Sequence, residues 1–156
     1  ITNRIKELSI LLNKYYKDNN DLILLGILDG CLMFLKDLKK FLKINFTLEY
    51  LNISSYDGKK RGKISYAYKK KISFKNKDIL IVDDIIDSGN TNLFIKKIIN
   101  EDKPKSIKTL SLLVKKESKH LSEWYGFEIK NKYVIGYGMD INNLFRDLND
   151  IYIQEN

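Results

Sequence analysis

Acidic, hydroxyl and glycine residues follow one another at positions 83–91, directly after an apolar run at 79–82. The apolar run is typical of a strand buried on both faces of a parallel sheet. Residues 93–99 then have the apolar spacing of an amphipathic helix. The sequence therefore predicts a strand, a short polar loop and a helix N-terminus. Free backbone N–H groups and the helix dipole attract an anion to such a junction, and Gly89 lets the backbone approach it closely.

Two adjacent carboxylates, Asp83 and Asp84, need a different partner, because a carboxylate repels a phosphate. The vicinal hydroxyls of a ribose are suitable, since a carboxylate is a strong hydrogen-bond acceptor. We therefore predict a site for a ribose 5-phosphate group, with the loop on the phosphate and the acidic pair on the sugar. The alternative is an ordinary strand–turn–helix with a solvated acidic end. A Walker A loop is excluded, because the chain has no Gly-Lys-Ser/Thr.

Composition limits the possible partners and compartment. The chain has 156 residues, of which 44% are hydrophobic and 31% charged, as in a globular protein with its own core. Its net charge of +8 favours anionic ligands. Basic residues cluster only at 59–61 and 69–71, so we do not expect a nucleic-acid surface. Cys31 is the only cysteine, which fits a cytoplasmic location. With no membrane-length apolar run and no visible signal peptide, we expect no membrane association.

Repeated strand–loop–helix units predict right-handed crossovers and a parallel sheet. Polar residues 54–63 are long enough for a functional lid, and a disordered basic turn is the alternative. The expected elements are helices at 4–16, 32–41 and 93–99, strands at 22–28, 46–53, 64–74, 79–82, 107–114, 133–140 and 151–153, a short helix and turn at 121–127, and a loop or short helix at 142–149. No repeat or linker divides the chain, so we expect one domain over residues 1–156.

Several segments match one known family in consistent order. They are residues 26–30 (GILDG), 54–56 (SSY), 112–116 (LLVKK) and the run 126–148. Together with residues 79–91 they resemble the type I phosphoribosyltransferases, and among these the hypoxanthine-guanine phosphoribosyltransferases. The run 126–148 discriminates most, because orotate and adenine relatives lack its purine-side pattern. The resemblance covers nearly the whole chain. It implies an α/β fold, with a mostly parallel sheet of about five strands flanked by helices and a small hood from the chain ends.

The resemblance also implies a reaction in purine salvage. The phosphoribosyl group of phosphoribosyl diphosphate is transferred to N9 of hypoxanthine or guanine, giving IMP or GMP and pyrophosphate. Xanthine is left open as a third 6-oxopurine base. The reaction requires Mg²⁺, and relatives form homodimers or homotetramers. The bond at ribose C1 breaks through an oxocarbenium-like state, so catalysis depends mostly on positioning and charge placement.

The family pattern then suggests a role for each matching residue. Asp87 would exchange a proton with purine N7 as general base or acid. Lys115 would donate to purine O6 and Tyr133 would stack on the base, although a solvated lysine and a core aromatic are the structural alternatives. The phosphoribosyl group would be held by Asp83, Asp84, Asp87, Ser88, Gly89, Asn90 and Thr91. The purine would be bound by Lys115, Tyr133, Val134 and Asp140. Pyrophosphate would be bound by Asp29, Gly30 and Arg146, and Mg²⁺ would be bound by Asp83, Asp84 and Asp140. Ser55 and Tyr56 would belong to a mobile loop over the site.

Two positions depart from the family pattern. Relatives usually have Glu-Asp at 83–84, so Asp83 is one methylene shorter. They often carry Lys or Arg at the position of Asp29, next to a non-proline cis peptide. We therefore predict weaker pyrophosphate binding, or a compensating cation from residues 59–61.

A regulatory protein that kept this fold, and now senses a nucleotide or binds nucleic acid, is the second hypothesis. Such a protein has no need of a proton-transfer group or a pyrophosphate arginine. The enzyme is favoured because the full set is present, namely Asp87, Lys115, Tyr133, Asp140 and Arg146.

Overall fold

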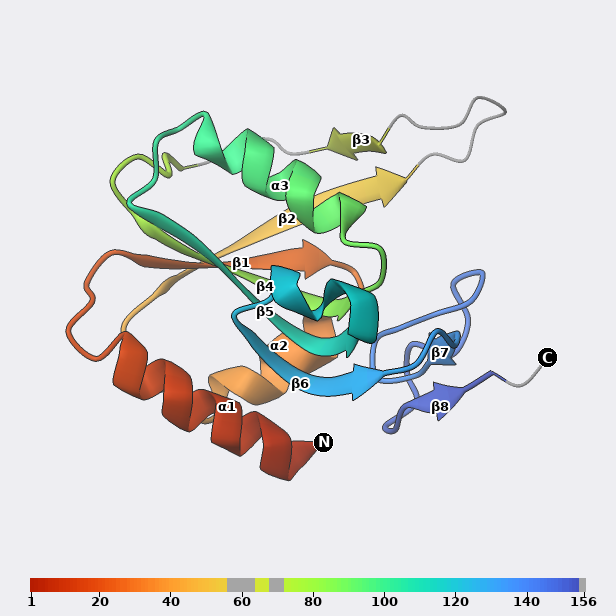
Figure 1. Cartoon of the computed structure of the whole chain (residues 1–156). Helices are drawn as coiled ribbons and strands as arrows, with labels where there is room; N and C mark the ends of the chain where they lie inside the picture. Colours follow the sequence, from red (N-terminus) through yellow and green to blue (C-terminus); the bar gives the residue numbers. More distant parts are fainter. Residues whose placement is uncertain (56–63, 68–71, 155–156) are drawn as a thin grey trace.

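Six strands form one sheet, in the order β3-β2-β1-β4-β5-β6, in the computed structural model, which describes residues 1–55, 64–67 and 72–154 (Figure 1). Five of them run parallel, and β3 pairs antiparallel with β2 at one edge. This confirms the predicted α/β fold, and the strands predicted from residues 46 and 64 pair with each other, the second of them as the shorter β3. The strands are β1 (Leu22–Leu28), β2 (Thr47–Ser55), β3 (Ile64–Ala67), β4 (Asp78–Ile86), β5 (Ser106–Lys115) and β6 (Trp124–Ile129).

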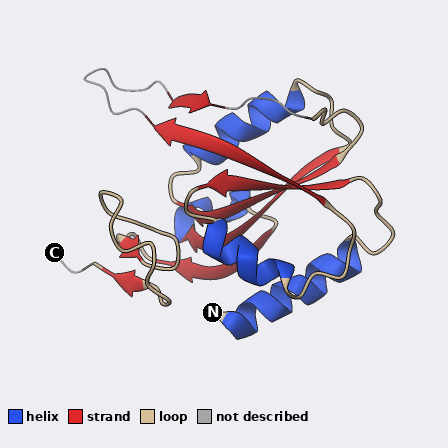
Figure 2. Cartoon of the chain, turned by 180° about the vertical axis from the view of Figure 1, so that it is seen from behind, coloured by secondary structure: helices blue, strands red, loops and turns tan. Residues whose placement is uncertain are grey.

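Helices cover both faces of this sheet. Helices α1 (Thr2–Tyr15) and α2 (Leu32–Lys39) lie on one face and α3 (Asn90–Asn100) on the other (Figures 1 and 2). Alternate residues of β1 therefore enter different cores: Leu24 packs in the cluster of α1 and α2, and Leu25 in the cluster of α3. Burial on both faces is why the central strands are uninterrupted apolar runs and do not alternate with polar residues.

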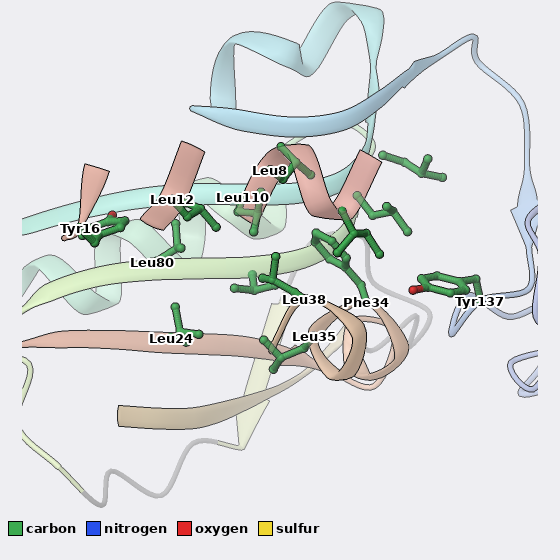
Figure 3. Close-up of a cluster of buried hydrophobic side chains, with 14 of the residues drawn as sticks. Leu8, Leu12, Tyr16, Leu24, Phe34, Leu35, Leu38, Leu80, Leu110 and Tyr137 are labelled. Atoms are coloured by element: carbon green, nitrogen blue, oxygen red, sulfur yellow. The ribbon is translucent and has the colours of Figure 1, made fainter. Parts of the chain in front are cut away.

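The larger core joins the two helices to the central strands (Figure 3). It also reaches the hood, the C-terminal segment that follows β6. Tyr137, which follows the last parallel strand, lies at its edge beside Phe34 of α2. The Tyr137 hydroxyl donates a hydrogen bond of 2.5 Å to Asp37 Oδ2 on the same helix. The hood is therefore fixed to α2 by a buried ring and a hydrogen bond. Other members of this core are Leu8, Leu12, Leu24, Leu35, Leu38, Leu80 and Leu110.

The prediction of a short helix and turn at 121–127 is wrong. A 3₁₀ helix, η1 (Lys116–Leu121), comes first, and residues 124–129 then form the edge strand β6, parallel to β5. A Cβ on Gly126 would lie 2.4 Å from the Leu112 carbonyl oxygen, so the glycine allows the strands to approach closely. The segment is rich in aromatic residues that suit strands, but its hydrogen-bond partners are on β5 and invisible to local periodicity.

The single strand predicted at 133–140 is also wrong. Only β7 (Val134–Ile135) is extended, and it pairs antiparallel with β8 (Tyr152–Ile153). Positive φ angles at Gly136 and Gly138, +88° and +98°, turn the backbone out of the strand region. The predicted loop at 142–149 and the final short strand are confirmed. The C-terminal end of the chain builds most of the hood, and Ile1 packs in the same core as Tyr137 and Val134 of this segment.

The strand order reverses between β1 and β4, which are parallel neighbours at the centre of the sheet. In open α/β sheets the crevice outside the carboxyl ends of the strands at this point is the usual ligand site. The hood lies at that same edge (Figure 1). Within the described ranges, no helix combines the length and apolarity needed to cross a membrane.

Candidate active site

The acidic pair lies inside β4, which continues to Ile86 and does not end at the carboxylates. Asp83 is only 6% exposed, and Asp84 is half-buried. Backbone amides stabilise both side chains: Asp83 Oδ1 accepts from Asp84 N at 3.1 Å, and Asp84 Oδ1 from Ile85 N at 2.9 Å. Burial raises the pKa of the Asp83 carboxyl well above its usual range, and the neighbouring Asp84 charge raises it further. Burial also raises the pKa of Asp84. The two carboxyls are therefore poised for a cation or for hydroxyl donors.

The loop after β4 leads directly into α3, as predicted. Gly89 has φ +80° at the start of the helix, and a Cβ there would lie 2.0 Å from Leu121 Cδ1. The first amide to bond back within the helix is that of Leu93, which donates to the Gly89 carbonyl at 2.9 Å. The amides of Thr91 and Asn92 therefore have no acceptor within the helix, and the first turn contains no acidic residue. This helix start can accept an anion.

Lys115 and Asp87 meet across the ends of two neighbouring strands. Lys115 is the last residue of β5 and is 8% exposed, while Asp87 follows β4. Lys115 Nζ lies 2.7 Å from Asp87 Oδ1 and donates to Asn131 Oδ1 at 2.8 Å. Its ammonium also lies 5.9 Å from the centroid of the Tyr133 ring. Lys115 is therefore a buried, partnered lysine and not a solvated one, and Tyr133, 73% exposed, is not a core aromatic.

Two adjoining cavities open at this edge of the sheet. The larger has a volume of about 220 Å³ and the smaller about 80 Å³, and they share Ile85 and Asp87 in their walls. The smaller suits a phosphate-sized group beside the helix start, and the larger suits a small planar ring beside Tyr133. The larger is lined by Asp84, Ile85, Asp87, Lys115, Lys132, Tyr133, Val134, Met139 and Asp140. The smaller is lined by Asp83, Ile85, Ile86, Asp87, Ser88, Gly89, Thr91 and Asn92.

Gly30 joins the loop after β1 to the acidic pair and to the hood. A Cβ on Gly30 would lie 1.8 Å from Asp84 Oδ2, and a Cβ on Gly138 would lie 2.2 Å from the Gly30 carbonyl oxygen. The loop after β1, the end of β4 and the hood therefore approach one another too closely for a side chain at Gly30 or Gly138. The Leu28–Asp29 peptide is cis, as the resemblance implied. The Asp29 side chain is exposed, so its charge faces the solvent side of the loop.

Arg146 and Asp140 form an ion pair in the hood. Arg146 Nη2 lies 2.7 Å from Asp140 Oδ1, and Nη1 donates to the Gly138 carbonyl at 2.9 Å. Asp140 Oδ2 also accepts from the Asn143 amide at 2.6 Å. The guanidinium therefore lies at the same edge as Gly30 and is near enough to Asp84 to oppose the rise in its pKa.

Most of the predicted site residues are thus brought to one edge of the sheet. Ser55 ends β2, but Tyr56 and the basic residues 59–61 lie outside the described residues. Sequence reasoning missed Asn131, Lys132 and Asn92. The first two lie just before Tyr133, where no motif marks them. Asn92 is buried in the first turn of α3, and its Nδ2 donates to Thr109 Oγ1 at 3.1 Å. A polar residue at an otherwise apolar helix position was the only available signal.

Comparisons with known proteins agree with this geometry. A family profile described as phosphoribosyl transferase domain matches residues 1–142. A hypoxanthine-guanine phosphoribosyltransferase of Dictyostelium discoideum is 35% identical over 156 residues, which is 95% of this chain and 87% of that protein. The structure of a hypoxanthine phosphoribosyltransferase from Staphylococcus aureus superimposes with a TM-score of 0.89 and 31% identity, covering 99% of this chain and 86% of that one.

A hypoxanthine phosphoribosyltransferase of Trypanosoma cruzi, solved in complex with its product IMP, has a TM-score of 0.88 and 30% identity, covering 97% of this chain and 88% of that one. These relatives favour an enzyme over a regulatory protein of the same fold. The chain therefore belongs to the phosphoribosyltransferase family, among the hypoxanthine-guanine phosphoribosyltransferases.

Proposed function

We propose that this chain transfers the 5-phosphoribosyl group of phosphoribosyl diphosphate to N9 of hypoxanthine or guanine, releasing pyrophosphate and forming IMP or GMP. The observation that carries the proposal is the adjacency of two cavities at Asp87: one leads to the start of α3, and the other contains Lys115 and Tyr133. A nucleoside monophosphate needs this combination, an anion site and a planar site separated by a group that can hold a sugar. Residues 1–156 act in this proposal as one phosphoribosyltransferase domain.

The base would be selected by Lys115 and held against Tyr133. An ammonium only donates hydrogen bonds, so it pairs with a 6-oxo group and not with a 6-amino group. A site built to donate to an oxygen rejects an analogue that cannot accept, because a buried donor is then left without a partner. The exposed Tyr133 ring offers a flat face for stacking, and Val134, which lines the same cavity, would bind the purine edge through its backbone.

Asp87 would move the proton. As N9 bonds to ribose C1 and the C1–O bond to pyrophosphate breaks, the purine loses one proton, and the Asp87 carboxylate accepts it from N7. Lys115, 2.7 Å away, stabilises the carboxylate before transfer and remains as the donor to O6 afterwards. The 5-phosphate would be bound by the free amides at the start of α3 and by the hydroxyls of Ser88 and Thr91.

Mg²⁺ fits the acidic residues of this site. Asp83 is buried, and no ion pair within the described residues gives it a cationic partner. In the same residues no three carboxylate, thiol or imidazole groups converge on one point, so substrate oxygens would have to complete the coordination. Mg²⁺ is commonly held in this way, by one or two carboxylates plus phosphate oxygens. Asp83, Asp84 and Asp140 are the candidate ligands, and the bound ion would neutralise charge on the pyrophosphate leaving group.

Arg146 would contact pyrophosphate after exchanging its pairing with Asp140, since a guanidinium fork matches phosphate oxygens. Gly30 would supply a backbone amide beside it. A cytoplasmic location and a homodimeric or homotetrameric assembly belong to the same proposal.

The test is a base panel with the purified chain, phosphoribosyl diphosphate and Mg²⁺. We expect nucleotide formation from hypoxanthine or guanine and little from adenine, with xanthine as the informative third base. Asp87→Asn should lower kcat by about 100-fold or more, because it removes the proton acceptor but keeps the shape. Asp18→Asn, an exposed change in the turn after α1, is the matched control. Absence of turnover with every 6-oxopurine, or full activity of Asp87→Asn, would contradict the proposal.

A further inference from the structure

Asn131 accepts the only hydrogen bond that the Lys115 side chain makes within the described part of the chain. It lies two residues before Tyr133 and two after β6, which pairs with the strand that Lys115 ends. Its Oδ1 accepts from Lys115 Nζ at 2.8 Å. A lysine as buried as Lys115 needs such partners, because an unpaired charge is costly away from water.

The donors of Lys115 can be counted. An ammonium has three N–H groups and no acceptor. One is donated to Asn131 Oδ1 at 2.8 Å, while Asp87 Oδ1, 2.7 Å from Nζ, is an ion-pair partner. No third acceptor lies within reach in the described part of the chain. The three N–H groups turn together about the Cε–Nζ bond, so the hydrogen bond to Asn131 also fixes the directions of the other two. Lys115 lines the larger cavity together with Asp87 and Tyr133.

We propose that Asn131 is a positioning residue that sets the directions of the free Lys115 donors, and thereby the preference for a 6-oxo over a 6-amino purine. This inference rests on the proposed function of the site. The ion pair with Asp87 attracts the ammonium whatever the rotation of its N–H groups, so without Asn131 the free donors would no longer point at one place. Since the ammonium only donates, the role of Asn131 requires an acceptor oxygen at this position and on a side chain of this length.

The experiment compares two substitutions of nearly equal size. Asn131→Leu removes the acceptor, and Asn131→Asp keeps it. For Asn131→Leu we expect the KM for hypoxanthine to rise about tenfold, the effect of losing one hydrogen bond to a charged group, with less than a twofold change in the KM for phosphoribosyl diphosphate. The inhibition constant of adenine should change little, so discrimination between the two purines falls about tenfold. Asn131→Asp should stay within about threefold of the wild type in each constant.

The control is Asn100→Leu, the same replacement at the exposed end of α3. The inference is overturned if Asn131→Leu leaves the hypoxanthine KM unchanged, if it raises the KM of both substrates equally, or if Asn131→Asp is as impaired as Asn131→Leu. Failure of the wild-type chain to use any 6-oxopurine would instead overturn the proposed function, so the two failures are distinguishable. Melting temperatures of all variants separate a positioning effect from loss of folding.

Discussion

Gly30→Ala is the substitution that best tests how the loop after β1 supports the acidic pair. A Cβ at this position would lie 1.8 Å from Asp84 Oδ2, against 3.4 Å for ordinary contact, a deficit of 1.6 Å. The Asp84 carboxylate cannot move freely, because it is half-buried and accepts from Ile85 N at 2.9 Å. The substitution must therefore displace the carboxylate or push the loop away from it.

The size of the effect follows from this deficit. Extra volume in a packed site costs about 1–3 kcal/mol, and each kcal/mol lowers the melting temperature of a chain of this length by about 2–4 °C. We expect a fall of about 2–12 °C in melting temperature. A misplacement of about 1 Å in a group that positions substrate can cost about 100-fold, so we expect kcat/KM to fall by that order.

The assay is a double-mutant cycle read on the free energy of unfolding, with steady-state kinetics alongside. Asp84→Ala removes the atoms that the new methyl group would meet. Gly30→Ala should therefore destabilise the wild-type background but add almost nothing in the Asp84→Ala background. Gly26→Ala, in β1, is the matched control, since the nearest atoms to its Cβ would be side-chain atoms of Leu35, Cys31 and Tyr50 at 3.0–3.1 Å.

We expect Gly26→Ala to keep kcat/KM within about threefold of the wild type, because crowding in the core does not move the carboxylate. The reasoning is refuted if Gly30→Ala retains wild-type kinetics, or if it destabilises the Asp84→Ala background as much as the wild-type background.

Three other outcomes are expected. Asp83→Asn should raise the melting temperature by about 2–6 °C while lowering activity, because it removes a buried charge without a cationic partner; thermal unfolding that shows no gain contradicts this. Asp37→Asn should cost about 1 kcal/mol at neutral pH. Burial raises the pKa of Asp37, but hydrogen bonds from Lys40 and Tyr137 outweigh it and hold the pKa below 3.8. A carboxyl with a lowered pKa in the folded state stabilises the fold above pH 3.8, and this stabilisation is lost as the pH falls through the folded-state pKa. The difference in free energy of unfolding between wild type and Asp37→Asn should therefore shrink below pH 3.8, and a difference that stays constant would contradict this. Asp29→Lys should lower the pyrophosphate inhibition constant by about tenfold, because it reverses a charge on an exposed loop; an unchanged constant removes the argument.

The local sequence pattern was enough to predict the central strands of the sheet and the loop that follows β4. The apolar runs of β1, β4 and β5 identify buried parallel strands, because a strand covered on both faces has no polar side. The order of carboxylates, hydroxyls and glycine at 83–91 predicts the anion site and the helix start, since both depend on neighbouring residues. Even there, the strand continued through Asp83 and Asp84, because β4 pairs with β5 on both sides of Asp84, at Asp83 and at Ile85.

The sequence by itself determined the strand–loop–helix repeat and the residue types at the ends of the strands, because these act within one turn or one strand. Only the tertiary structure decided that residues 124–129 form a strand, that the hood turns at Gly136, and that Lys115 meets Asp87 and Asn131. Each of these depends on a partner distant in sequence, and a hydrogen bond or a buried ion pair exists only once packing has brought both groups together and excluded water.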